Sequence, residues 1–208
     1  MITIETFNCG PMGANCYIVG DDADGKAFMV DPGGPNGRME RYIEENHLEI
    51  QYILLTHGHG DHIGGVKHYK TLYPQAKVIA CELERGLLTD PGKNFSKTTA
   101  GQEIVLEADI YVNDGDTLNV GSMELFFLGT PGHTPGGLSI YLPAAKCVFS
   151  GDTLFAQSVG RTDLGGSQTK LFQSIKEKLY ALPDDTEVYP GHMGKTAIKI
   201  EKEYNPFV

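Results

Sequence analysis

Apolar and polar residues alternate over the first thirty positions as they do in β-strands. Turns rich in glycine or polar residues, at 10–13 and 21–25, separate the apolar stretches. The alternation therefore predicts three strands, over residues 2–7, 16–19 and 27–30. From Asn36 to His47, apolar residues recur at helical spacing among charged ones, which predicts an amphipathic helix.

A short apolar run, Tyr52-Ile53-Leu54-Leu55, is typical of a buried central strand. We expect a helix after it, from about Asp61 to Leu72, then a strand at 78–80 and a polar surface loop over 90–103. The second half of the chain repeats this outline. It has strand-like stretches at 104–105, 118–120, 123–128, 138–142, 147–149 and 187–189, and helical patterns over 169–182 and from about Thr196.

Strands followed by helices, twice over, predict two sheets packed together with helices outside them, in an α/β sandwich. No stretch is long enough to be a linker, so we expect residues 1–208 to form a single domain. No segment approaches the roughly 20 apolar residues of a membrane span. The N-terminus also has no basic stretch leading into an apolar one, so we expect a cytoplasmic protein that does not bind membranes.

The formal net charge is −10, and no run of basic residues occurs anywhere in the chain. This balance argues against nucleic acid as a partner, and the oligomeric state stays open. Cys9, Cys16, Cys81 and Cys147 are scattered without a CxxC spacing. We expect these four thiols to be reduced and mostly buried.

Four of the apolar strands end in the same way, because residues that can bind metal ions follow at once. Loops at the ends of buried strands are where rigid scaffolds hold functional groups. Imidazole and carboxylate groups are common ligands of zinc, iron and manganese. The segments are Thr56-His57-Gly58-His59-Gly60-Asp61-His62, Thr130-Pro131-Gly132-His133, Ser150-Gly151-Asp152-Thr153 and Tyr189-Pro190-Gly191-His192.

The spacing in the first segment suits two ions. His57 and His59, two residues apart in a turning loop, can bind one ion together. Asp61 and His62 can face a second ion about 3.5–4 Å from the first, and Asp152 is a natural bridging carboxylate. We therefore expect two divalent ions, with zinc as the first candidate and iron or manganese also compatible.

The alternative is that these histidines are solvated loop residues. Against it, five of the seven histidines lie in glycine-flanked loops after apolar strands, and three of them fall within six residues. His47 and His68 lie in helical segments and are interpreted as surface or packing residues. The chain has no GxSxG elbow, no GxxxxGK[ST] phosphate loop and no HExxH motif.

The THxHxDH pattern of residues 56–62, with a distant His, Asp and His, resembles the signature of the metallo-β-lactamase superfamily. The resemblance spans most of the chain and implies a four-layer αββα sandwich of two mixed sheets with the metals at one edge. Asp31 matches a supporting aspartate of that family, although it also suits a plain turn. The resemblance implies one ion on His57, His59 and His133, a second on Asp61, His62 and His192, and Asp152 between them.

Within the superfamily, the surroundings most resemble the hydroxyacylglutathione hydrolase (glyoxalase II) branch. The resembling stretches are 129–136, 151–155 and Asn205-Pro206-Phe207. The resemblance implies hydrolysis of a small glutathione-type thioester by a metal-bound hydroxide, with Asp61 as the catalytic residue that orients the nucleophile. Aspartate at position 152 differs from the cysteine or serine of many true β-lactamases.

Two features depart from that branch. Its full-length enzymes carry a C-terminal helical region that helps to bind glutathione, whereas only residues 193–208 follow His192 here. Gly160-Arg161-Thr162-Asp163 replaces a lysine and tyrosine pair that holds the substrate. Arg161 falls at the lysine's place and can bind a substrate carboxylate, with a surface salt bridge as the alternative.

The sequence leaves other functions open. Persulfide dioxygenases share the Gly-Arg-Thr-Asp stretch, so one iron on His57, His133 and Asp152 is the leading alternative, and a lactonase is another. A binding module with a structural zinc would normally have four ligands, often cysteines. Seven histidine and aspartate ligands fit that reading poorly.

Overall fold

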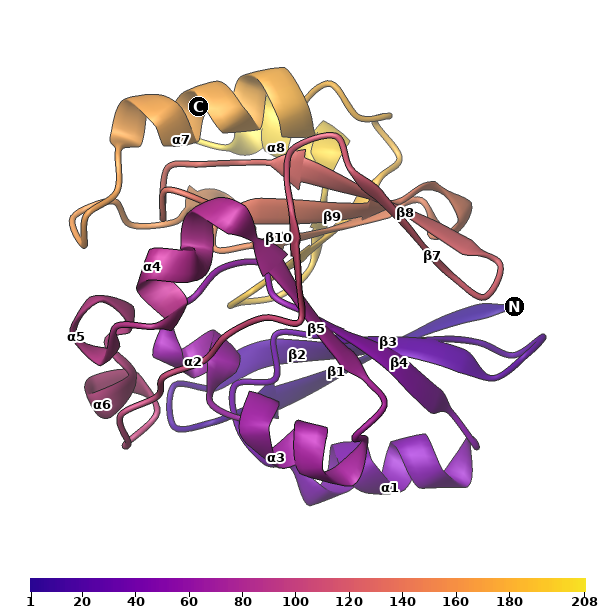
Figure 1. Ribbon diagram of the computed structural model, residues 1–208. Coiled ribbons are helices and arrows are strands. Elements are labelled where there is room, and N and C mark those ends of the chain that lie inside the picture. The colour runs from indigo at the N-terminus through magenta and orange to yellow at the C-terminus, as the bar shows by residue number, and fades with distance from the viewer.

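The computed structural model describes residues 1–208 and stacks two six-stranded sheets between layers of helices (Figure 1). The first sheet has the spatial order β1 (Ile2–Cys9), β2 (Ala14–Asp21), β3 (Lys26–Val30), β4 (Glu49–Leu54), β5 (Lys77–Cys81), β6 (Ile110–Val112). The second has the order β14 (Thr196–Ala197), β13 (Glu187–Pro190), β10 (Cys147–Gly151), β9 (Leu138–Leu142), β8 (Met123–Gly129), β7 (Thr117–Val120). A separate hairpin pairs β11 (Leu154–Phe155) with β12 (Ser158–Val159).

Helices cover both outer faces of this pair of sheets (Figure 1). Those over the first sheet are α1 (Gly37–Glu45) and α3 (Val66–Leu72), and those over the second are α7 (Gln168–Ser174), its π-helical continuation (Ile175–Leu179) and α8 (Ile198–Tyr204). Shorter helices are α2 (Gly60–Ile63), α4 (Arg85–Leu88), α5 (Pro91–Asn94) and α6 (Ser96–Thr99), with 3₁₀ turns at Glu82–Glu84 and Pro143–Ala145. The expected αββα sandwich is confirmed. None of the helices combines the length and the apolar character that crossing a membrane requires.

The alternation of side chains along the strands produces three hydrophobic layers. In β2, Cys16 and Ile18 face the helices below the first sheet, whereas Tyr17 and Val19 face the second sheet. A third cluster, which includes Val148, lies between the second sheet and the helices above it. Both faces of β2 are buried, and its central residues Cys16–Val19 form the continuous apolar run that is typical of such a strand. All four cysteines are buried and free, as expected.

Strand direction explains why the ligand loops meet. In the first sheet β3 and β4 are parallel, so Asp31 and the histidine-rich loop leave it at the same edge. In the second sheet β10 is parallel to β13 and antiparallel to β9, which is antiparallel to β8. The strands β8, β10 and β13 therefore point the same way. Their following loops carry His133, Asp152 and His192 to one edge of the sandwich.

Two predicted elements differ from the structure around this edge. The helix expected over 61–72 is divided into α2 and α3 at Gly64 and Gly65. A Cβ at Gly64 would lie 2.3 Å from the Gly33 oxygen, so the chain bends where the loop after β3 packs against it. The surface loop expected over 90–103 instead contains two short helices, α5 and α6. Asp90 caps the N-terminus of α5.

One predicted strand is wrong. Residues 104–105 are not a strand. The sixth strand of the first sheet is β6, which the sequence did not predict because its three partly exposed residues are too few to show an alternation. The main-chain N–H and C=O of Ile104 instead bond to the side chains of Ser96 and Asn94. This stretch therefore braces the α5–α6 segment.

Replacing Gly132 with alanine should destabilise the fold by about 3 kcal/mol. Gly132 has φ 149°, and an added Cβ would lie 2.3 Å from the Leu171 Cα of α7. Gly115→Ala is the matched control, because φ is 90° but nothing lies within 4 Å of its Cβ. It should cost about 1 kcal/mol, from backbone strain alone. Urea unfolding measures the stability of both variants. Equal losses of stability would contradict the prediction, because they would show that α7 moves aside for the added Cβ at little cost.

Candidate metal centre

The histidine-rich loop begins immediately after β4 and is held tightly by its neighbours. A Cβ at Gly60 would lie 2.3 Å from the Ser96 Cα, so only glycine lets α2 approach α6 this closely. Gly58 donates its N–H to the Glu84 carboxylate at 2.8 Å. This close packing buries the imidazoles of His57, His59 and His62 at one end of the sheets.

One set of ligand atoms belongs to His57, His59 and His133, and all lie within 4.8 Å of one another. His59 Nδ1 is 2.9 Å from His133 Nε2. Thr56 Oγ1, 3.1 Å from His57 Nδ1, leaves His57 Nε2 for the interior of the site. The other nitrogen of His133, Nδ1, lies 2.7 Å from the Arg161 carbonyl oxygen and can donate to it. Such bonds fix the tautomer of a ligand histidine.

A second set belongs to Asp61, His62 and His192. Asp61 Oδ2 lies 3.2 Å from His192 Nε2 and 3.8 Å from His62 Nε2. The Asp152 carboxylate stands between the two sets, with Oδ2 3.6 Å from His133 Nε2 and 3.7 Å from His192 Nε2. All seven predicted ligand side chains therefore meet, and Asp152 occupies the position that a bridging ligand needs.

The site contains buried polar atoms that have no hydrogen-bond partner. They are His57 Nε2, His59 Nε2, His62 Nε2 and Asp152 Oδ1. The last two lie 3.4 Å apart, which is an ion-pair distance without hydrogen-bond geometry. A buried polar atom without a partner is costly, so such an atom normally has a bound water or ion as its partner. Convergent imidazole and carboxylate donors of this kind fit divalent zinc, iron or manganese. The residues present therefore fit the metal that the sequence predicts.

Electrostatics divide the histidines into two kinds. Burial, assisted by the neighbouring imidazoles, lowers the pKa of His59 to about 4 and that of His57 well below its usual value. Burial likewise lowers the pKa of His133. These three rings are neutral at pH 7 and have lone pairs available to a metal.

His62 behaves in the opposite way. Its burial disfavours the charged form, but the Asp152 and Asp31 carboxylates outweigh burial and raise the pKa of His62 well above its usual value. Burial would likewise raise the pKa of the Asp61 carboxyl, but a hydrogen bond from His192 and the charge of His62 hold it below the usual range. Asp61 is therefore ionised at neutral pH.

Asp31 supports this centre from behind as well as forming a turn. Its carboxylate accepts hydrogen bonds from the Thr56 N–H at 2.8 Å and the Thr56 hydroxyl at 2.5 Å. Its Oδ2 also lies 3.0 Å from His62 Nδ1. With only 1% of its surface exposed, Asp31 orients His62 from the buried side.

Sequence reasoning missed Glu84. Its carboxylate is 1% exposed and accepts the N–H of Gly58 at 2.8 Å and of Gly136 at 2.7 Å. Glu84 therefore connects the loop of His57 and His59 to the loop of His133. Its position just after the apolar strand β5 could have indicated a functional role for Glu84. The charged residues beside it, however, are typical of a surface helix.

A cavity of about 390 Å³ opens over both ligand sets. Arg161 lines it, as expected of a substrate-binding residue. The guanidinium is exposed and binds Asp163 through two contacts of 2.7 and 2.6 Å. The salt bridge that was the alternative is therefore present, and substrate binding by Arg161 stays a prediction.

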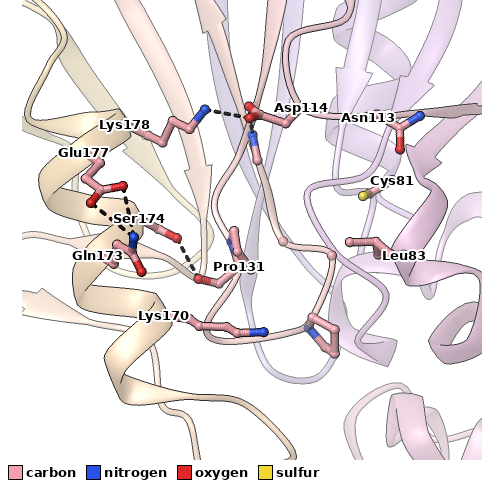
Figure 2. A pocket seen from close by; sticks show the side chains of 14 residues that line it. Cys81, Leu83, Asn113, Asp114, Pro131, Lys170, Gln173, Ser174, Glu177 and Lys178 are labelled. Carbon is pink, nitrogen blue, oxygen red and sulfur yellow. Dashed lines mark hydrogen bonds and ion pairs between the residues drawn. The ribbon is translucent and has the colours of Figure 1, made fainter.

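A larger cavity, of about 540 Å³, lies between α7 and the outer side of the His133 loop (Figure 2). Its charged side chains bond mainly to one another, for Lys178 binds Asp114 at 2.6 Å and Gln173 bonds to Glu177. It contains none of the seven ligand residues. The chemistry therefore belongs to the smaller cavity.

Residues 9–192 match the metallo-beta-lactamase superfamily, and the chain belongs to it. The chain is 40% identical to the probable metallo-hydrolase YqgX of Bacillus subtilis, over 96% of this chain and 94% of that protein. It is 33% identical to the hydroxyacylglutathione hydrolase GloC of Haemophilus influenzae, over 100% of this chain and 98% of that protein. The family resemblance predicted from the sequence is confirmed.

Solved structures of similar proteins have the same fold. The BLEG-1 B3 metallo-beta-lactamase superposes with a TM-score of 0.92 at 37% identity, covering 99% of both chains. TTHA1623, solved in a di-iron-bound form, superposes with a TM-score of 0.83 at 30% identity, covering 98% of this chain and 100% of that one. The superfamily, together with the two ligand sets, indicates a metallo-hydrolase that uses divalent metal.

Replacing Glu84 with glutamine should weaken metal binding by about tenfold, as the loss of a group behind metal ligands typically does. The amide keeps one acceptor oxygen but turns an NH₂ towards one of the two N–H groups. Chelator competition measures the change. Glu82→Gln, at an exposed pair with Arg85, is the control. Equal metal affinities in all three proteins would contradict the proposed support by Glu84.

Proposed function

We propose that this protein hydrolyses small glutathione-type thioesters and holds two divalent ions, with zinc as the first candidate. The observation that carries the proposal is the Asp152 carboxylate, 3.6 Å from His133 Nε2 and 3.7 Å from His192 Nε2. A carboxylate shared by two ligand sets suits a two-ion hydrolytic site. The likeness to GloC supports the substrate class.

Water adds to the thioester carbonyl, a C–O bond forms and the C–S bond breaks. The water oxygen and one of its protons end in the carboxylic acid, and the other proton goes to the released thiolate, which becomes the thiol. Divalent ions at the two ligand sets would lower the pKa of a water and polarise the carbonyl. Asp61 accepts a hydrogen bond from the attacking water and orients it. The buried imidazoles keep the ligand geometry fixed, and Asp31 holds His62 in place during the reaction.

Asp152→Ala should lower kcat for S-lactoylglutathione by at least about a hundredfold with little loss of fold, because both ligand sets lose a shared carboxylate. Asp61→Asn should lower kcat comparably. Asp185→Asn, at an exposed pair with Lys146, is the control and should be fully active. Unchanged turnover by Asp152→Ala protein with reduced metal content would refute the proposal.

Arg161 is proposed to hold a carboxylate at the rim of the cavity. Arg161→Ala should then raise KM for S-lactoylglutathione about tenfold with little change in kcat. Asp163→Asn should lower KM, because it frees the guanidinium from its two contacts. If both variants keep the wild-type KM, the pair is a surface salt bridge without a part in binding.

The two ligand sets should differ in the protons that metal binding releases. His62 has a raised pKa and is protonated at pH 7 without metal, so an ion at its set must displace about one proton. Affinity there should rise about tenfold per pH unit up to the pKa of His62. Burial lowers the pKa of His57, His59 and His133, so an ion at that set displaces fewer protons and its affinity should depend less on pH. Calorimetry in buffers of different ionisation enthalpy measures the proton release, and equal release at both sets would contradict this assignment.

Three other reactions share the scaffold. A mono-iron persulfide dioxygenase using His57, His133 and Asp152 would consume oxygen with glutathione persulfide. A lactonase would open acyl lactones, and the likeness to BLEG-1 favours a test of β-lactams. Oxygen uptake, lactone opening or β-lactam cleavage faster than thioester hydrolysis would each replace the proposal. A cytoplasmic location is a further prediction, which cell fractionation tests.

A further inference from the structure

The cavity over the ligand sets has apolar walls. Beyond the ligands themselves, Arg161 is its only charged lining residue, and Asp163 already binds that guanidinium. The other polar lining residues are Thr99 and Ser158, whose hydroxyls carry no charge. The remaining wall consists of Met12, Phe95, Phe155, Val159, Leu164 and Met193.

Two aromatic rings lie directly against the ligand imidazoles. Phe95 stands 5.7 Å from His59, between ring centroids, and Phe155 stands 6.3 Å from His192. One ring therefore flanks each ligand set. A carbonyl bound between the two sets, as the proposed function requires, would have Phe95 and Phe155 as the only rings in the cavity wall apart from the ligand imidazoles.

The backbone holds Phe95 in a strained conformation. Its φ of 56° and ψ of 19° are left-handed, which is rare for a bulky residue. Its carbonyl accepts the N–H groups of Thr98 and Thr99, and the fully buried Asn94 beside it binds the Ser96 N–H and the Ile104 carbonyl. Strain maintained by buried bonds is typical of functional positions.

Met193, another residue of the cavity wall, is held in a similar way. It follows His192 with φ 70°, and the buried Asn15 amide donates to its carbonyl at 2.9 Å and to that of Pro190 at 2.9 Å. Two strained apolar residues, each braced by a buried asparagine, thus face the same cavity.

We propose that Phe95, Phe155 and Met193 form an acyl pocket that selects thioesters whose acyl group carries an aromatic or other bulky apolar substituent. This inference rests on the proposed function and narrows its substrate class. A polar peptide-like thiol portion extends past the rim, near Arg161, whereas the substituent on the acyl carbon packs between the rings. Small hydroxyacyl groups such as lactoyl leave that space unfilled.

Mandelate and lactate test the pocket, because they differ only in a phenyl in place of a methyl group. We expect the metal-loaded protein to bind mandelate at least about tenfold more tightly, and to hydrolyse S-mandeloylglutathione at least about tenfold faster in kcat/KM than S-lactoylglutathione. Phe95→Ala should remove most of both preferences at unchanged metal content. Phe95→Leu should keep most of them, and Leu83→Ala, in the other cavity, should keep all.

Acid binding and thioester hydrolysis together distinguish a failure of the acyl pocket from a failure of the proposed reaction. Equal handling of the two thioesters and the two acids, or an equal loss for both in Phe95→Ala, would overturn the acyl pocket and leave thioester hydrolysis standing. A mandelate preference that depends on Phe95, in a protein that hydrolyses neither thioester, would support the pocket and overturn the proposed reaction.

Discussion

The centre depends on a costly arrangement, in which imidazoles and carboxylates are buried with several atoms that no protein group satisfies. His57 Nε2, His62 Nε2 and Asp152 Oδ1 have no hydrogen-bond partner, although they lie at the junction of two packed sheets. Burial keeps three rings neutral, and neutral rings are what a divalent cation needs. The same burial that would destabilise an empty site therefore prepares it for metal.

The two sheets divide the work of holding these groups. The first sheet supplies the histidine-rich loop and the supporting Asp31, and the second supplies His133, Asp152 and His192 from three strands that point the same way. Glu84 then joins the loops of the two sheets through backbone N–H groups of Gly58 and Gly136. The relative position of the two sheets thus sets the distances between the proposed ligands, so the site forms only when the two sheets pack together.

The sequence predicted most of the strands, because strands such as β2, β3 and β10 each contain a short apolar run. The seven residues that it proposed as metal ligands converge at one edge of the sandwich, because each follows a strand in a glycine-flanked loop. The prediction failed where a long-range contact decides the structure. Gly64 and Gly65 divide a helix because the loop after β3 packs against them, and Glu84 and Phe95 act through partners distant in sequence. Local periodicity contains no trace of these contacts.

In the proposed site, two divalent ions share the Asp152 carboxylate. Anomalous diffraction from crystals of protein purified without chelator, recorded at the absorption edge of the metal it contains, can locate these ions. We predict two peaks, one among His57, His59 and His133 and one among Asp61, His62 and His192, with Asp152 bound to both. A single peak, or an Asp152 carboxylate that contacts only one of two ions, would contradict it.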